Sequence, residues 1–216
     1  NNSINSNRTI NFTVPASAPA GTVGVRVRVS STSSPGSTGG LGGSGEVEDH
    51  LLRILSTTDS GDFSRFAEAS STANSKLRMG ALVDTEPNGT TNSTATADDT
   101  TELKDEDGVT LPVSVARGTS TGTMVINVTN TTTASGYINA WVDWNNNGVL
   151  TDSGEQVVSN FAVSKSTSNS NKSFTLSVPS AAAFGLVGVR VRFTSIQTPG
   201  SVGFSGVGEV EDHLLR

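Results

Sequence analysis

Residues 143–155, DWNNNGVLTDSGE, place side-chain oxygens at alternating positions of a short segment. Alternating Asp and Asn residues followed by a glycine are typical of loops that wrap a hard cation such as calcium, because the glycine allows a sharp turn. The EF-hand loop has its bidentate Glu at position twelve, whereas this segment has a glycine there and an acid at position thirteen. The segment therefore predicts a variant calcium site or, alternatively, a β-hairpin turn rich in residues that tolerate left-handed backbone. The candidate ligands are Asp143, Asn145, Asn147, Asp152 and Glu155.

A second group of carboxylates lies between residues 84 and 107. Carboxylates at this density repel one another unless a cation lies between them or the segment stays extended in water. The segment is therefore interpreted either as a calcium site that stiffens a junction or as a solvated linker. Its candidate ligands are Asp84, Glu86, Asp98, Asp99, Asp105, Glu106 and Asp107.

The nonamer GEVEDHLLR occurs twice, at residues 45–53 and 208–216. In a strand, its two glutamates and its histidine lie on one face and its aspartate lies on the other. An inward aspartate needs a partner, and the two arginines of a repeated GVRVR segment are the obvious donors in each copy. The favoured interpretation is a structural ion pair, and the alternative is metal ligation shared with the acids of residues 84–107. The residues concerned are Glu46, Glu48, Asp49 and His50 with Arg26 and Arg28, and Glu209, Glu211, Asp212 and His213 with Arg190 and Arg192.

Residues that could support catalysis are scarce. The sequence has no HExxH motif and no cysteine nucleophile, and both histidines belong to the repeated nonamer. Trp141 and Trp144 have odd spacing in a predicted strand, so one should face the core and the other should lie at the rim beside the 143–155 loop. We therefore expect no enzyme, and the candidate ligand-binding residues are Trp144 and Tyr137.

Strands must position these residues, because the 23 Gly, the 7 Pro and the long Ser, Thr and Asn runs disfavour helix. Period-two alternation is sharpest in GVRVRV (24–29) and GVRVRF (188–193). Further alternating segments are separated by turn-forming clusters such as SSPGSTGG. Antiparallel strands with one buried face predict an all-β chain built as an antiparallel β-sandwich.

A long internal repeat organises the chain. The sequence from Asn5 matches the sequence from Asn169 at an offset of 164, which falls to 163 after a one-residue deletion. The sequence therefore predicts a tandem repeat of about 163 residues. Its expected parts are residues 1–53 as the C-terminal third of a preceding module, residues 54–107 as an irregular Asp- and Thr-rich linker or cap, and residues 108–216 as the β-sandwich that completes the second module.

The charge balance bears on partners. A net charge of −6 and a pI near 4.8 argue against nucleic acid or an anionic membrane surface, since both require clustered Lys and Arg. No apolar run reaches the roughly 18 residues of a membrane span, and the absence of cysteine excludes disulfides and thiolate metal sites.

The ordered segments MGALVDTEPNG, ADD, DEDGV, INAWVDWNNNG, SGEQV, GVRVRF and GEVEDH resemble the GEVED-type modules of large bacterial cell-surface and secreted proteins. The resemblance covers residues 54–216 and the final third of the pattern in residues 1–53. It implies a β-sandwich, extracellular display and calcium use, and it implies no enzyme. The sequence departs from the family pattern in two places. The module start, close to DFGDAP in such proteins, is DSGDFSRFAEAS here, which leaves a role for Asp59 or Asp62 unassigned. The last motif ends in His where the family has Tyr.

The expected function is that of a structural repeat module of an extracellular adhesin stalk, surface fibre or filament, secreted or displayed at the cell surface and rigidified by calcium at module junctions. Its expected partners are neighbouring copies of the same module, in the same chain or in a polymer. The alternative is a calcium-dependent module that binds a surface glycan or another ligand.

Overall fold

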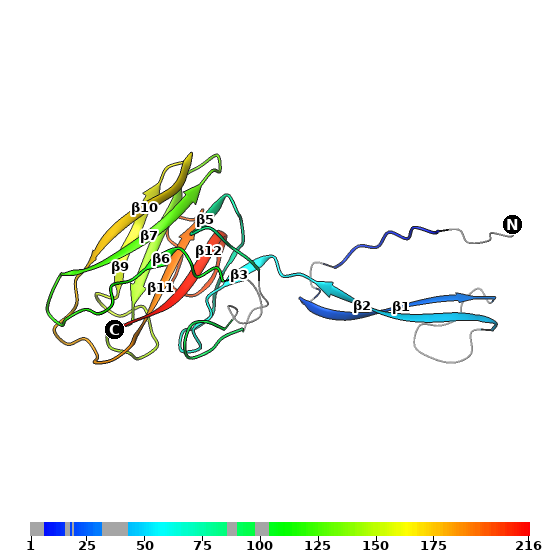
Figure 1. Ribbon diagram of the computed structural model, residues 1–216, viewed down its shortest axis with the longest axis horizontal. Helices are drawn as coiled ribbons and strands as arrows, with labels where there is room; N and C mark the ends of the chain where they lie inside the picture. Colours follow the sequence, from blue (N-terminus) through cyan, green and yellow to red (C-terminus); the bar gives the residue numbers. More distant parts are fainter. Residues whose placement is uncertain (1–6, 16–17, 19, 32–42, 86–89, 98–103) are drawn as a thin grey trace. The chain divides into compact units, whose positions relative to one another are not determined.

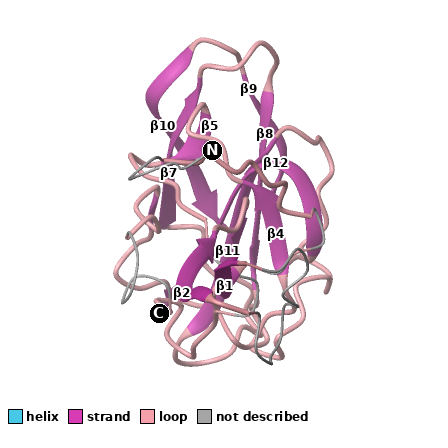
Figure 2. Ribbon diagram, turned by 90° about the vertical axis from the view of Figure 1, so that its right-hand side faces the viewer, coloured by secondary structure: helices cyan, strands magenta, loops and turns pink. Residues whose placement is uncertain are grey.

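The computed structural model describes residues 7–15, 18, 20–31, 43–85, 90–97 and 104–216. The chain divides into two compact units, Asn1–Ile54 and Leu55–Arg216. All regular elements in the described ranges are strands, and they are connected by loops (Figure 2). The strands are β1 (Gly21–Ser30), β2 (Gly45–Ile54), β3 (Thr58–Ser60), β4 (Ala69–Thr72), β5 (Leu77–Met79), β6 (Val109–Thr110), β7 (Gly122–Asn130), β8 (Gly136–Val142), β9 (Gln156–Val163), β10 (Thr167–Leu176), β11 (Val187–Thr194) and β12 (Gly203–Leu215).

The second unit is built from two sheets that share one core (Figure 1). One sheet has the order β10-β7-β5 with β6 also paired to β7, and the other has the order β3-β4-β12-β11-β8-β9. Side chains from both sheets form a single apolar cluster, so the unit is a β-sandwich.

Alternation in the sequence explains how the strands contribute to this core. In β7, Met124, Ile126 and Val128 are fully buried, while the residues between them lie on the other face of the strand. In β11 all eight residues are buried, because this strand lies between β8 and β12 and is covered on both faces. A second, smaller cluster of Phe63, Phe66, Ala95, Trp141 and Leu150 covers the face of the six-stranded sheet opposite the main core.

The two copies of the repeated motif form the same hairpin in different surroundings. β1 pairs antiparallel with β2, which places Arg26 opposite Asp49, and β11 pairs antiparallel with β12, which places Arg190 opposite Asp212. β1 and β2 form a two-stranded sheet with many exposed positions, whereas β11 and β12 lie in the middle of a six-stranded sheet. The sequence thus encodes one hairpin, and the neighbouring strands decide whether it is buried.

Two features differ from the sequence expectation. The described residues of 54–107 include the short strands β3, β4 and β5 and contribute Phe63, Leu77 and Met79 to the buried clusters, so these strands are part of the fold. The six-stranded sheet is mixed, because β4 pairs parallel to β12. In the described part of the chain, no helix is long and apolar enough to cross a membrane.

Candidate metal centre

Three carboxylates from distant parts of the sequence meet inside the second unit. Asp59 lies in β3, Asp105 precedes β6, and Glu209 lies in β12. One oxygen from each lies within 4.8 Å of the others, and the residues are 3%, 3% and 0% exposed. Among the described residues, these three form the one group of Asp, Glu, His or Cys side chains that lie close enough together to hold a metal ion. We call Asp59, Asp105 and Glu209 the carboxylate triad.

Backbone amides hold each carboxylate of the triad in place. Val210 N donates to Asp59 Oδ2 at 2.6 Å, and Asp84 N donates to Asp105 Oδ2 at 2.9 Å. Met79 N, in β5, donates to Glu209 Oε2. The triad is therefore fixed by β12, by β5 and by the segment before residue 86, all within one unit.

The electrostatics of the triad favour a bound positive charge. Burial raises the pKa of Glu209 well above its usual range, and the charges of Glu211 and Asp59 raise it further. Glu209 Oε1 is buried and has no hydrogen-bond partner. A buried carboxylate is stable when it is neutralised by a proton or paired with a cation, and a cation between three carboxylates would neutralise all of them together.

The donor set selects the kind of metal. The triad offers only oxygen, which suits hard cations such as calcium and magnesium and does not suit zinc or copper. Calcium binds oxygen at about 2.3–2.6 Å, so two ligands on opposite sides of the ion are separated by about 4.8 Å. The oxygens of the triad are within that separation, and Glu209 Oε1 is available as a ligand. The residues present therefore fit a hard cation such as calcium.

Glu211, the second glutamate of the nonamer, links the two sheets by hydrogen bonds. Glu211 accepts hydrogen bonds from Gly108 N and Val109 N, both at 3.0 Å, and its Oε2 lies 2.9 Å from His213 Nε2. Burial raises the pKa of Glu211, and the contact with His213 opposes this effect. Glu211 thus connects β12 to the start of β6 in the opposite sheet.

The aspartate of the nonamer points to the other face of β12 and pairs with an arginine. Arg190 Nε and NH2 donate to the two oxygens of Asp212 at 2.8 and 2.7 Å, and both side chains are fully buried. Phe63 N also donates to Asp212 Oδ2 at 3.1 Å. Arg192, also fully buried, donates to the carbonyl oxygens of Gly200 and Ser70, and burial lowers its pKa to about 10.

The same residues of the first copy lie on the surface. Arg26 Nε and NH2 donate to the two oxygens of Asp49 at 2.7 and 2.8 Å, with side chains 44% and 63% exposed. His50 Nε2 lies 3.0 Å from Glu48 Oε2, and Glu46 is exposed. Arg28, in β1, is half-buried. The ion-pair geometry is thus a property of the hairpin, and only the second copy adds the carboxylates of the triad.

The 143–155 loop is held by hydrogen bonds within the loop. The two oxygens of Asp143 accept from Asn147 N and Gly148 N, and the side-chain oxygens of Asn145 and Asn147 accept from backbone N–H groups two residues later. The side-chain amides of both asparagines donate to Asp152 Oδ2 at 2.8 Å, which lowers the pKa of Asp152. These oxygens thus take part in the hydrogen bonds of a turn.

Glu155 closes this loop and is 2% exposed. Neither of its carboxylate oxygens has a hydrogen-bond partner of ordinary geometry. Burial raises the pKa of Glu155, the charge of Asp143 adds to the rise, and the N–H groups of Asn145 and Asp152 oppose it. Glu155 is therefore a buried acid facing other acids.

The acids of residues 84–107 are placed differently from one another. Asp84 is half-buried and supplies the amide that holds Asp105, while exposed Asp107 accepts from Ala81 N at 3.0 Å. Glu106 is half-buried. Three further candidates fall outside the described residues: Glu86, Asp98 and Asp99. Of this group, the structure brings Asp105 to the triad.

The aromatic candidates do not form an exposed platform. Trp144 is 4% exposed and packs in the main core, while Trp141 packs in the second cluster, so the two indoles face opposite ways. Both indoles are therefore buried, and neither takes the rim position expected for one of them. Tyr137 is half-buried in β8, opposite Thr194 of β11 and Ala162 of β9.

Sequence reasoning missed Asp59 as a candidate ligand. It lies in the three-residue strand β3, whose sequence TDS has no apolar residue to signal a strand. The spacing from Asp59 to Glu209 also gives no local pattern. The one sequence-based hypothesis that pointed to the triad was the alternative in which the nonamer and the acids of residues 84–107 bind a metal together.

Comparison with known proteins agrees with this architecture. The model of the GEVED domain matches residues 1–53 and 137–216, which together make up more than half of the chain. No curated protein matches the chain. GEVED domains are modules of surface proteins and are generally non-catalytic. The matched segments include both copies of the hairpin and the strand that carries Glu209, and the chain belongs to the GEVED domain family.

Proposed function

We propose that this chain is a non-enzymatic structural module of an extracellular bacterial surface protein, and that calcium bound by the carboxylate triad makes the module rigid. The observation that carries the proposal is the convergence of three buried carboxylates from separate segments, one of which has an oxygen without a partner. A surface fibre or stalk needs modules that stay folded under mechanical load. A cation bound by ligands from distant segments would increase the resistance of the module to unfolding.

The position of the triad defines what calcium would fasten. Asp59 follows the first residue of the second unit by only a few positions, and Asp105 lies in the segment that leads into β6. A cation held by both residues and by Glu209 would tie these two segments to β12. Calcium was expected to make the junction between modules rigid. We propose instead that it binds within a module, close to the first residues of the second unit.

Repetition of the hairpin supports assembly in series. Both copies have the same pairing of Arg opposite Asp, and the second copy is completed by strands from residues 55–216. We propose that the partners of this chain are further modules of the same kind, in the same polypeptide or in a polymer.

Thermal unfolding of the full chain in calcium and in excess chelator tests the proposal. Calcium at about a thousand times its dissociation constant would add roughly 4 kcal/mol to the free energy of unfolding. For a domain of this size, each kcal/mol raises the Tm by about 2–4 °C, so we expect a rise of about 8–16 °C.

Two substitutions at the same position of the nonamer make the test specific. Glu209→Gln removes a charge from the triad, whereas Glu46→Gln changes the exposed counterpart in the first copy. The calcium-dependent rise should disappear in Glu209→Gln and persist in Glu46→Gln. Identical unfolding curves of the wild-type chain in calcium and chelator would contradict the proposal, as would an undiminished rise in Glu209→Gln.

A further inference from the structure

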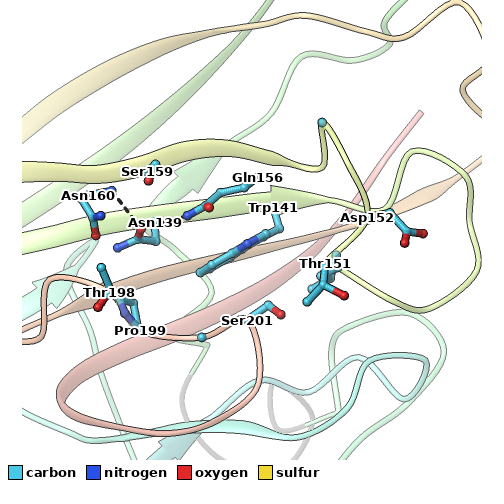
Figure 3. Close-up of a pocket in the computed structure, with 13 residues that line it drawn as sticks. Asn139, Trp141, Thr151, Asp152, Gln156, Ser159, Asn160, Thr198, Pro199 and Ser201 are labelled. Carbon is cyan, nitrogen blue, oxygen red and sulfur yellow. Dashed lines mark hydrogen bonds between the residues drawn. The ribbon is translucent and has the colours of Figure 1, made fainter.

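A cavity of about 440 Å³ lies on the face of the six-stranded sheet opposite the main core (Figure 3). Three segments form its wall: β8, the loop from Leu150 into β9, and the 198–201 segment between β11 and β12. Figure 3 shows the Trp141 ring in the middle, with Asn139, Gln156 and Asn160 on one side and Thr198, Pro199 and Ser201 on the other. The cavity shares no residue with the carboxylate triad.

Three polar atoms around this cavity are buried and have no hydrogen-bond partner: Asn139 Nδ2, Asn160 Oδ1 and Ser201 Oγ. Each comes from a different one of the three segments. Buried polar atoms in folded proteins nearly always have a partner, so three exceptions around one cavity mark places where water or a ligand completes the hydrogen bonds.

The orientation of the Asn139 amide is fixed by its neighbours. Asn139 Oδ1 accepts from Asn160 N at 2.9 Å and from Gln156 Nε2 at 3.2 Å (Figure 3). Since the backbone N–H of Asn160 can only donate, the Asn139 oxygen must face it, and its Nδ2 is left as a donor. The cavity therefore offers a donor from Asn139, an acceptor from Asn160, and a hydroxyl from Ser201 that can do either.

An irregular backbone places the two asparagines there. The β8–β9 pairing shifts register on both sides of Ala140, so that Asn139 opposes an extra residue of β9. Asn160 has a φ of 51°, in the left-handed region that non-glycine residues rarely adopt. β-Bulges are common next to binding sites because they re-aim side chains, and strained backbone clusters at such sites.

The chemistry of the wall selects the ligand. Of the residues that line the cavity, Asp152 is the charged one, and the others supply amides, hydroxyls, glycine, proline, leucine and an indole. A ligand with neighbouring hydroxyls matches donor and acceptor groups of this kind, because each hydroxyl both donates and accepts. The volume lies within the range of small-molecule sites, which is about 300–1,000 Å³.

We propose that this cavity binds a neutral polyhydroxylated ligand, a saccharide of one or two rings. Asn139, Asn160 and Ser201 hydrogen-bond to its hydroxyl groups, and Trp141 forms the apolar part of the floor. The proposal adds a recognition function to a structural module and does not depend on calcium.

Ligand-observed NMR on the full chain tests this proposal. The probes are the methyl glycosides of glucose, galactose, mannose and N-acetylglucosamine, together with maltose, cellobiose and lactose, each at millimolar concentration in the presence of chelator. The chelator separates this test from the carboxylate triad. We expect at least one probe to bind, and the absence of binding by every probe would overturn the proposal.

A glycine substitution isolates the proposed contact. Asn160→Gly removes the acceptor and keeps a residue that accepts a φ of 51°. Losing one such hydrogen bond should weaken binding by roughly tenfold. Asn169→Gly is the matched control, because Asn169 has a φ of 45° and lies in β10, away from the cavity.

Ser201→Ala provides a second test, since it deletes a buried hydroxyl that has no partner and should leave the fold intact. Weaker binding in Asn160→Gly and Ser201→Ala, with unchanged binding in Asn169→Gly, would support the proposal. Binding that is unaffected by both cavity substitutions would show that the saccharide binds elsewhere and would refute it.

Discussion

Asp49 and Asp212 occupy the same position of a repeated nonamer and make the same two-point contact with an arginine. They differ in burial: the Asp49 side chain is 63% exposed, and the Asp212 side chain is fully buried. Replacing each with Asn removes one charge and keeps the shape of the side chain. The two substitutions therefore compare a buried ion pair with an exposed ion pair of the same geometry.

The expected magnitudes follow from what each substitution leaves behind. Asp212→Asn leaves the Arg190 guanidinium buried without its counter-charge, which typically costs about 3–5 kcal/mol. With a urea dependence of about 2 kcal/mol per M, a loss of about 4 kcal/mol lowers the unfolding midpoint by about 2 M. Asp49→Asn should leave this midpoint unchanged, because water solvates the exposed Arg26 and because Asp49 lies in the first unit.

Tryptophan fluorescence is the appropriate assay, because both tryptophans of the chain, Trp141 and Trp144, lie in the second unit. The signal thus reports the unfolding of the unit that contains Asp212. If Asp212→Asn shifts the midpoint no more than Asp49→Asn does, the conclusion that the second copy depends on its buried ion pair is refuted.

Two further predictions use the same assay. Gly188→Ala should destabilise the second unit by about 1–3 kcal/mol, because an added Cβ would lie 2.4 Å from the Phe66 ring. Gly24 occupies the matching position of the first copy and has open space around it, so Gly24→Ala should have no effect. Equal effects of the two substitutions would contradict the packing around Gly188. Glu155 has a raised pKa, so its contribution to stability is fully present below its unfolded pKa of about 4.5 and is lost as the pH rises through its folded pKa. Glu155→Gln should therefore be more stable than the wild type at pH 7 and equal to it near pH 4, and a pH-independent difference would show that Glu155 does not titrate as described.

Alternation in the sequence was sufficient to predict the strands that carry the repeated arginines. GVRVR has a strict period of two, and the nonamer places its glutamates and its aspartate on opposite faces of a strand, so the arginines were expected as partners of the aspartate. The structure adds that the two strands form a hairpin in which Asp212 lies opposite Arg190. The all-β class followed in the same way from composition and spacing. These features are local, and local patterns can be read without knowing which strands become neighbours.

The carboxylate triad could not be predicted in full, because its members meet only through tertiary structure. β3, β4 and β5 have three or four residues each, and β3 and β4 contain almost no apolar side chains, so no alternating pattern marked them as strands. Asp59 becomes a neighbour of Glu209 because β3 pairs with β4 and β4 pairs with β12. The cavity near Asn139 was hidden for a similar reason, since it depends on a shift of register between β8 and β9.

The number of calcium ions bound by the chain tests the central claim most directly. Isothermal titration of the chelator-treated chain should show one site that is lost in Glu209→Gln and retained in Asp152→Asn, because the triad forms in the second unit and the oxygens of the 143–155 loop serve a turn. A chain that binds no calcium, or a single site that survives Glu209→Gln and disappears in Asp152→Asn, would contradict the claim.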